Sequence, residues 1–298
     1  MAKVRVLRQE GQPPSLLTRL RYLSEELRLH ESLFALPFAY TGMLMAARGL
    51  PTLHQFIWIT LAMIGARNFG MGMNRVIDKG IDAVNPRTRE RHIPAGRTRV
   101  WEMLAVSGLA LAIFLVAAWQ LNPMAFALAW IAAAYLVFYS YTKRFSWASN
   151  LALGWALAIG PAGGWIGVTG HLSWNMLLLA SVVFFWASAF DILHHMPSRD
   201  FYIQHGLHSV VQRFGLKTAL MWARVHDALA VLALIALGLT LKLDAPYYVG
   251  IAIAATILIR KHTLVSPSDL SRLGVAFFLY NAVFSAIILV ATFVTLVW

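Results

Sequence analysis

Three polar side chains that can bind a hard cation recur at a regular spacing in one part of the chain. Asn74, Asp78 and Asp82 stand four residues apart. On a continuous helix, residues at i, i+4 and i+8 share one broad face. Mg²⁺ commonly binds one or two carboxylates and completes its shell with water and substrate phosphate oxygens. The spacing therefore predicts a Mg²⁺ site shared with a phosphate ligand, the alternative being a polar helix end in the lipid headgroups.

Positive charges flank this motif on both sides. Arg67 lies seven residues before Asn74, inside an apolar segment. A charged side chain at membrane depth is costly and is a candidate functional residue, although a long basic side chain can also reach the interface from near a helix end. The stretch 85–97 is rich in arginine, and its Arg91 and Arg97 are candidate diphosphate contacts. Cytoplasmic loops are basic in any case, because positive charge fixes topology and attracts anionic lipid.

The composition is that of a membrane protein. Hydrophobic residues make up 59% of the 298 positions and charged residues only 13%, against roughly a quarter charged in soluble domains. The excess apolar surface must face a lipid bilayer. The chain has no cysteine, which excludes disulfides and thiolate chemistry. Its net charge of +12 lies in short loops between apolar segments rather than on a soluble surface, so no nucleic-acid partner is expected.

The elements that must position these residues are long apolar segments. They cover residues 30–48, 55–74, 101–120, 123–142, 150–169, 172–192, 218–240, 245–260 and 273–297. Most of them approach the roughly 20 residues that a transmembrane helix needs, and they are too long for barrel strands of about 10 residues. Twenty-one of the 25 Lys and Arg residues lie in the first 29 residues or in the loops after the second, fourth, sixth and eighth segments.

This distribution of positive charge places the N-terminus and those loops in the cytoplasm. The sequence therefore predicts an all-α, polytopic membrane bundle of about nine transmembrane helices. No soluble domain, repeat or low-complexity linker interrupts it. We expect a single membrane domain over residues 1–298, with residues 1–29 as a basic cytoplasmic segment.

The run of Asn74, Asp78 and Asp82, followed by residues 85–88 (Asn-Pro-Arg-Thr) and a Pro-Ala-Gly turn, resembles the first aspartate-rich motif of the UbiA superfamily of intramembrane prenyltransferases. The resemblance extends along nearly the whole chain. Residues 33–40 are similar to the first helix of that family, and 139–144 to its Tyr-x-x-x-Lys segment. Two further stretches, 205–209 and 264–271, look like the branch that serves menaquinone synthesis, which is close to the 4-hydroxybenzoate polyprenyltransferases.

The resemblance implies transfer of a polyprenyl group from its diphosphate to an aromatic acid or naphthoate-type acceptor in quinone biosynthesis. Mg²⁺ and cationic side chains neutralise the leaving diphosphate, and an allylic carbocation forms in a dry cavity. The implied setting is the cell membrane, with the active side facing the cytoplasm. The implied catalytic residues, which are also the metal ligands, are Asn74, Asp78, Asp82 and Asp191. The implied substrate-binding residues are Arg67, Arg91, Tyr139, Lys143, Arg144 and Asp200.

Three of these basic residues have a specific implied role. Arg67 takes the position that binds the carboxylate of an aromatic acid. Lys143 and Arg144 would donate charge-assisted hydrogen bonds to the departing diphosphate. The alternative for Lys143 and Arg144 is that they end the fourth apolar segment on its cytoplasmic side.

The second aspartate motif of the family is altered in this chain. The family pattern has an aspartate seven residues after the first and another four residues later. Here Asp191 is retained, Ser198 and Tyr202 stand at the two later positions, and Asp200 lies between them. A serine offers one neutral oxygen, and a tyrosine is bulky and protonated at pH 7. Losing two carboxylates weakens any site for a hard cation.

Other functions remain open beside the Mg²⁺-dependent enzyme. The main alternative is a degenerate family member that binds a quinone, prenyl lipid or pigment as a membrane subunit, which the altered second motif favours and the intact first motif opposes. A transporter is less favoured, because the repeated halves typical of transporters are not evident. Zinc is also disfavoured, since the nearby histidines have no second ligand cluster at a recognised spacing. These histidines are His194, His195, His205 and His208.

Overall fold

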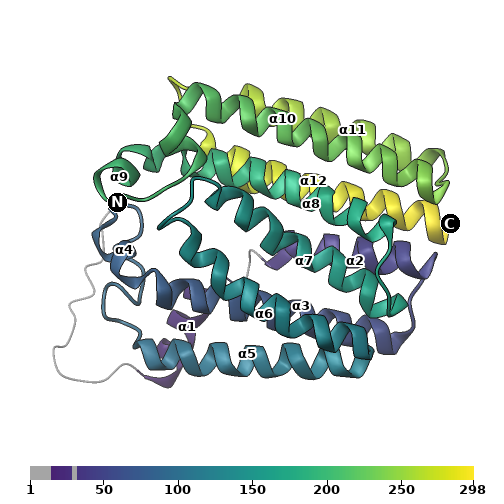
Figure 1. The fold of residues 1–298 in the computed structure, drawn as a ribbon, viewed down its shortest axis with the longest axis horizontal. Helices are drawn as coiled ribbons and strands as arrows, with labels where there is room; N and C mark the ends of the chain where they lie inside the picture. Colours follow the sequence, from purple (N-terminus) through teal and green to yellow (C-terminus); the bar gives the residue numbers. More distant parts are fainter. Residues whose placement is uncertain (1–14, 29–31) are drawn as a thin grey trace, which may run out of the picture.

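The computed structural model describes residues 15–28 and 32–298, and the described part is a bundle of helices (Figure 1). The basic residues Lys3, Arg5 and Arg8 of the predicted cytoplasmic segment lie outside the described residues. The helices are α1 (Leu16–Leu27), α2 (Ser32–Ala47), α3 (Leu53–Ile77), α4 (Lys79–Val84), α5 (Val100–Leu121), α6 (Pro123–Thr142), α7 (Ser149–Thr169), α8 (Trp174–His195), the 3₁₀ turn η2 (Met196–Ser198), α9 (Arg199–Gln204), α10 (Val210–Leu241), α11 (Ala245–Thr263) and α12 (Leu273–Val297). The described residues form no β-strand, only an isolated bridge between Ser266 and Asp269.

Within residues 15–28 and 32–298, each predicted apolar segment coincides with a helix, and six helical stretches are long and apolar enough to cross a membrane. These are α5, α6, α7, α10, α12 and the continuous stretch Trp174–Gln204. The apolar part of α2 is shorter, Leu36–Ala47. α3 carries Arg67 and Arg75, and α11 ends in three basic residues, so neither is among the six. The structure thus confirms an all-helical, multi-pass protein, while the count of nine spans and the cytoplasmic N-terminus stay predictions.

The helices pack closely, and small residues permit this. The most extensive pairs are α3 with α5, α7 with α8, and α8 with α10. Between α2 and α7, a side chain at Gly42 would meet the carbonyl oxygen of Pro161, and one at Gly164 would meet that of Ala39. Membrane helices approach most closely where small residues face each other. The outer faces expose large apolar residues such as Leu109 and Leu239, as expected for contact with lipid.

Two short helices lie at one end of the bundle (Figure 1). α4 follows α3 and carries the end of the first aspartate motif, whereas α9 follows α8 and η2 and carries the end of the altered second motif. α10 is bent near its start, because Gly215 has a φ of 77° and a ψ of 171° that interrupt the helix. Glycine accepts this positive φ without the steric cost that other residues pay. The loops after α3 and after α8 are therefore both available to line one site.

Candidate active site

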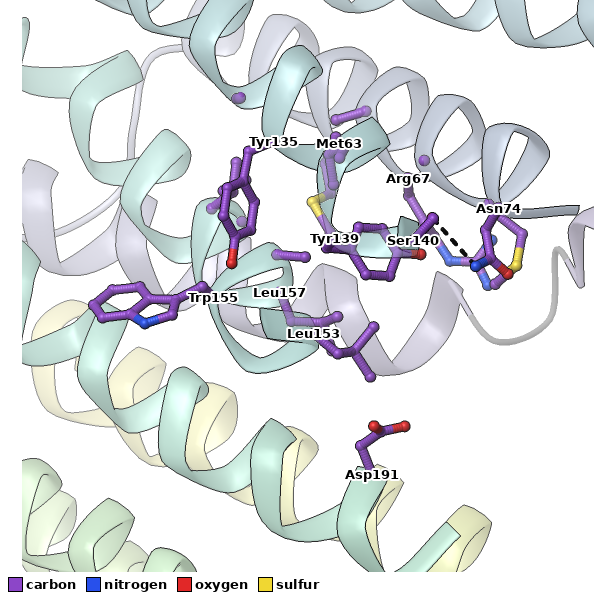
Figure 2. A pocket seen from close by; sticks show the side chains of 18 of the residues that line it. Met63, Arg67, Asn74, Tyr135, Tyr139, Ser140, Leu153, Trp155, Leu157 and Asp191 are labelled. Atoms are coloured by element: carbon purple, nitrogen blue, oxygen red, sulfur yellow. Dashed lines mark hydrogen bonds between the residues drawn. The ribbon is translucent and has the colours of Figure 1, made fainter. Parts of the chain in front are cut away.

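A cavity of about 690 Å³ lies inside the bundle, within the size range of small-molecule sites. Part of its wall is apolar and includes Ile59, Phe114 and Leu128, from α3, α5 and α6. The wall nearest α4 and α9 carries charged and polar side chains from both the first and the second aspartate motif. Asp191 lies across the cavity from Asn74 (Figure 2). Residues that follow α3 and residues that follow α8 therefore line one polar wall.

The first aspartate motif keeps its helical spacing across the junction of α3 and α4. The amides of Asp78 and Asp82 donate to the carbonyl oxygens of Asn74 and Asp78, at 2.9 and 2.8 Å. Asn74 Nδ2 donates to Asp78 Oδ2 at 2.7 Å and to Ser140 Oγ at 3.2 Å, the second bond reaching across to α6 (Figure 2). All three motif residues line the cavity, as their spacing predicts.

The carboxylate of Asp78 is buried and paired with two cations from the end of α6. Lys143 Nζ lies 2.5 Å from Asp78 Oδ2, and Arg144 Nη2 lies 3.2 Å from Asp78 Oδ1. Arg144 also donates to the carbonyl of Ile77 at 2.8 Å. Lys143 and Tyr139 line the cavity, whereas Arg144 acts from behind Asp78. Both basic residues therefore contact the first aspartate motif, and their role toward a diphosphate stays a prediction.

The loop after α4 brings two arginines to the cavity. Arg91 Nη1 lies 2.6 Å from Asp82 Oδ2. Arg87 Nη1 donates to Ser198 Oγ at 2.6 Å and to the carbonyl of His194 at 3.2 Å, and so connects the first motif to the second. Burial lowers the pKa of the Arg87 guanidinium, and the charge of Arg91 lowers it further. Arginine still remains charged at neutral pH.

The remaining carboxylate of the second motif is held by neutral and weakly basic groups. Asn150 Nδ2 donates to Asp191 Oδ2 at 2.7 Å, and His195 Nδ1 lies 3.3 Å from the same oxygen. The ring of His195 contacts the ring of Tyr202, with centroids 5.3 Å apart. Tyr202 is buried and lines the cavity. The position at which the family pattern has its third aspartate therefore holds an aromatic ring packed beside Asp191.

Asp200 is not brought to the site, contrary to prediction. Its side chain is 85% exposed, pairs with Arg199 at 3.3 Å, and is absent from the cavity wall. The physical reason is the helical turn of α9, which directs Tyr202 inward and Asp200 outward. His205, one of the histidines considered for zinc, stacks on Phe201 with ring centroids 4.1 Å apart.

Arg67 lines the cavity but has an unforeseen pair of partners. Its Nη1 and Nη2 donate to the carbonyl oxygens of Leu27 and Arg28, each at 2.9 Å. These carbonyls belong to the C-terminal end of α1. The sequence suggested that Arg67 either binds the carboxylate of a substrate or extends to the membrane interface. Neither prediction included these two carbonyl partners. A substrate-binding role for Arg67 stays a prediction.

The donor set fits Mg²⁺ shared with a diphosphate. The oxygen-bearing groups Asn74, Asp78, Asp82 and Asp191 all line the charged wall. Within residues 15–28 and 32–298, no group of three or more His, Asp or Glu side chains is close enough to hold a metal ion by itself. Mg²⁺ seldom needs such a cage, because it takes one or two carboxylates and fills its shell with substrate phosphate and water.

Residues 35–283 match the UbiA prenyltransferase family. The chain belongs to this family. A relative from Aromatoleum aromaticum, named 4-hydroxybenzoate octaprenyltransferase, is 32% identical over 251 residues, which are 83% of each chain. The apo structure of a UbiA homologue from Aeropyrum pernix K1 has a TM-score of 0.82 and 30% identity, and the likeness covers 90% of this chain and 98% of that one. Membership of the UbiA family makes the protein a prenyltransferase.

A more distant UbiA structure agrees in fold. The homologue from Archaeoglobus fulgidus, solved with GPP and Mg²⁺, has a TM-score of 0.63 and 19% identity, over 90% of this chain and 99% of that chain. At this identity the likeness shows the shared helical architecture alone. The polar end of the cavity must therefore be interpreted from the residues of this chain.

Sequence reasoning missed several residues of the UbiA site. Asn150 binds Asp191 and also accepts the amide of Val210 at 3.0 Å, so it joins α7, α8 and α10. The only sequence signal for it was a polar residue at the start of an apolar segment. Arg87 lay within the basic stretch 85–97, but nothing in the sequence distinguished it from Arg91 or Arg97. Ser140, which accepts from Asn74, lies within the stretch 139–144, but the resemblance gave it no role of its own.

Proposed function

We propose that the protein transfers a polyprenyl group from its diphosphate to an aromatic acid or naphthoate-type acceptor in quinone biosynthesis. One observation carries this proposal: carboxylates and Lys or Arg side chains alternate along one wall of a cavity whose remaining wall is largely apolar. Such a wall suits a metal-bound diphosphate, while the apolar wall suits an isoprenoid chain. The name of the Aromatoleum aromaticum relative supports an aromatic acid as the acceptor.

The proposed chemistry breaks the bond between the first prenyl carbon and the diphosphate oxygen. The diphosphate leaves with the electron pair, a carbon of the acceptor ring bonds to the prenyl carbon, and the ring loses one proton. Lys143 donates to the leaving oxygens, and Arg87 and Arg91 hold the diphosphate from the opposite loop. The apolar wall keeps water away from the allylic cation, which would otherwise be trapped as an alcohol.

Asn74, Asp78, Asp82 and Asp191 are the residues that would hold Mg²⁺. When bound, the metal neutralises the negative charge that develops on the diphosphate. Lys143 already lies 2.5 Å from Asp78, and Arg91 2.6 Å from Asp82. These cations therefore hold the carboxylates in position, and they lie next to the place that the diphosphate would take.

For the acceptor, we propose that Arg67 binds the carboxylate of the aromatic acid. It lies two helical turns along α3 from Asn74 and lines the same cavity. An arginine carries five N–H groups, so it can bind a carboxylate while Nη1 and Nη2 also donate to the carbonyls of α1, and this contact would fix the orientation of the ring. Arg67 would then position the acceptor ring, and the diphosphate contacts would position the prenyl donor. Together they would place the reacting ring carbon next to the bond that breaks.

The proposed location is the cell membrane, with the site facing the cytoplasm and residues 1–298 acting as one membrane domain. The positive charges of the chain support this orientation, because the stretches between α3 and α5 and between α8 and α10 carry 7 of the 25 Lys and Arg residues. α4 and α9, which flank the polar wall, lie at the same end of the bundle (Figure 1).

The direct test is turnover by purified protein in lipid nanodiscs. Polyprenyl diphosphates of several chain lengths are offered with 4-hydroxybenzoate and with 1,4-dihydroxy-2-naphthoate, with Mg²⁺ and with EDTA. We expect a prenylated product that requires Mg²⁺, with one acceptor preferred. A protein that binds prenyl lipid or quinone but transfers no prenyl group would instead be a binding subunit, the reading that Ser198 and Tyr202 favour.

The altered second motif makes a separate prediction about metal affinity. Replacing Ser198→Asp together with Tyr202→Asp adds two hard oxygen ligands beside Asp191, so the Mg²⁺ concentration for half-maximal activity should fall by about tenfold, equivalent to about 1.4 kcal/mol. The measurement is a Mg²⁺ titration of the transfer rate at fixed donor and acceptor. Ser198→Ala with Tyr202→Phe is the matched neutral control and should leave the titration midpoint within about twofold, because it adds no ligand.

The opposite result is equally informative. If wild type works at full rate at low Mg²⁺ and the doubly acidic variant is slower, the present residues are already adapted to the metal. In that case the Arg87–Ser198 bond and the packing of Tyr202 on His195 would be features of an active site that needs fewer carboxylates.

A further inference from the structure

Helix α1 lies against α3 at the polar end of the cavity (Figure 1). Most of its residues are exposed or half-buried, and Leu16, Leu17 and Leu20 face outward. Its last turn is different, because Glu26 and Leu27 are buried. Arg28, which follows the helix with a φ of 47°, lines the cavity itself. The end of α1 therefore belongs to the wall of the site.

Glu26 attaches this end to the rest of the protein. Its Oε1 accepts the amide of Ile93 at 3.0 Å, and its Oε2 lies 3.3 Å from Arg75 Nε. The backbone oxygen of Glu26 also accepts from Arg75 Nε, at 3.1 Å. Both side chains are almost fully buried, 6% exposed for Arg75 and 1% for Glu26. Removing one member of a buried ion pair leaves the other charge uncompensated, so α1 depends on this contact.

The carbonyl groups at the end of α1 then hold Arg67. A helix C-terminus has carbonyl oxygens without helical partners and carries a partial negative charge. Two of them, those of Leu27 and Arg28, accept from Nη1 and Nη2 of Arg67, each at 2.9 Å. Arginine has five N–H groups in a planar fork. Because Nη1 and Nη2 of Arg67 both donate to α1, the orientation of its planar guanidinium group at the cavity wall is fixed.

We propose that α1 is a part of the acceptor-binding site, in which Glu26 is a positioning residue that acts through the α1 carbonyls on Arg67. This inference rests on the proposed function, since it assigns the acid's carboxylate to Arg67. A guanidinium that is already oriented loses less entropy when it binds a carboxylate. α1 thereby contributes to the selection of an acid over a neutral analogue without touching the acceptor.

The test compares an aromatic acid with its methyl ester, which lacks the carboxylate charge. In wild type, kcat/KM for the acid should exceed that for the ester by about 10- to 100-fold, the range expected for a hydrogen bond to a charged group. Arg67→Gln should reduce this ratio to near one. Glu26→Gln should lower it at least about fivefold, through a higher KM for the acid, while the KM for the prenyl diphosphate stays within about twofold.

Glu25→Gln is the matched control, because it removes the same charge from the same helix. The side chain of Glu25 is 44% exposed and pairs with Arg21 and His92, each at 2.7 Å, at the surface. Surface pairs contribute little, so the acid-to-ester ratio should not change. Hydrogen exchange of α1 in both variants reports whether the helix is still docked, and it should speed up in Glu26→Gln alone.

Three results would overturn the inference. Equal use of acid and ester by wild type would remove the role of Arg67 while leaving prenyl transfer intact. An unchanged ratio in Glu26→Gln, with α1 shown to be undocked by hydrogen exchange, would show that α1 does not position Arg67. If wild type transfers no prenyl group, the proposed function fails, and equilibrium dialysis of the labelled acid then decides the inference alone: equal binding by wild type and Glu26→Gln would reject it, and weaker binding by Glu26→Gln would support it.

Discussion

Asp78→Ala is expected to lower the rate of prenyl transfer by about 10²–10³-fold, the usual cost of losing one group that stabilises charge in a transition state. Asp78 is the most connected carboxylate of the site. It accepts from Asn74 and pairs with Lys143 and Arg144, so its removal deletes a metal ligand and leaves two cations without their anion. The measurement is single-turnover product formation at saturating donor, acceptor and Mg²⁺, which separates chemistry from product release.

Two further variants show whether the lower rate of Asp78→Ala comes from the lost charge and whether it is specific to this carboxylate. Asp78→Asn keeps the size and most hydrogen bonds of the side chain and removes only its charge, so it should be nearly as slow as Asp78→Ala. Asp200→Ala removes a carboxylate of the same type that is exposed and outside the cavity, and it should retain the wild-type rate. Near-normal turnover by Asp78→Ala would mean that the motif is only a polar helix end.

The parts of this site that could be predicted from sequence are those with local causes. The spacing of Asn74, Asp78 and Asp82 is a helical repeat, and α3 and α4 preserve it. Apolar segments bounded by charged loops predicted where helices lie, since a long apolar run in a membrane must satisfy its backbone within the helix. The match of residues 139–144 to a family segment made Lys143 a candidate site residue, and its Nζ lies 2.5 Å from Asp78 Oδ2.

The parts that escaped prediction depend on which helices meet. Arg67 could not be assigned to α1, because 39 residues separate it from Arg28 and neither has a sequence signal for the other. Asn150 became part of the site only when α7 packed on α8. Asp200 and Tyr202 are two residues apart in the six-residue helix α9, so they point to different sides of it, and only Tyr202 faces the cavity. A sequence pattern that counts acidic residues favours Asp200, while the turn of α9 selects Tyr202.

The second large effect is expected far from these motifs, at a buried charge cluster between α10 and α11. Lys261 is fully buried, and its Nζ lies 2.6 Å from Asp227 Oδ2. His262 Nε2 lies 2.7 Å from the same oxygen, and Lys261 is also 3.5 Å from Asn281 Oδ1 on α12. None of the three charged or titratable residues lines the cavity. Their contribution is therefore expected in the stability of the bundle.

Lys261→Met should destabilise the protein by about 3–5 kcal/mol, the cost of leaving a buried partner charge uncompensated. Replacing both residues, Lys261→Met with Asp227→Leu, should recover most of this loss, because apolar side chains of similar volume commonly substitute for a buried pair at little cost. Thermal unfolding in detergent, followed by tryptophan fluorescence, measures both variants against Lys242→Met, a matched substitution at an exposed lysine. If the double variant is as unstable as the single one, lost packing rather than unpaired charge is the cause. If Lys261→Met behaves like Lys242→Met, the ion pair adds nothing to the stability of the bundle, and its presence inside a membrane domain would need a functional explanation.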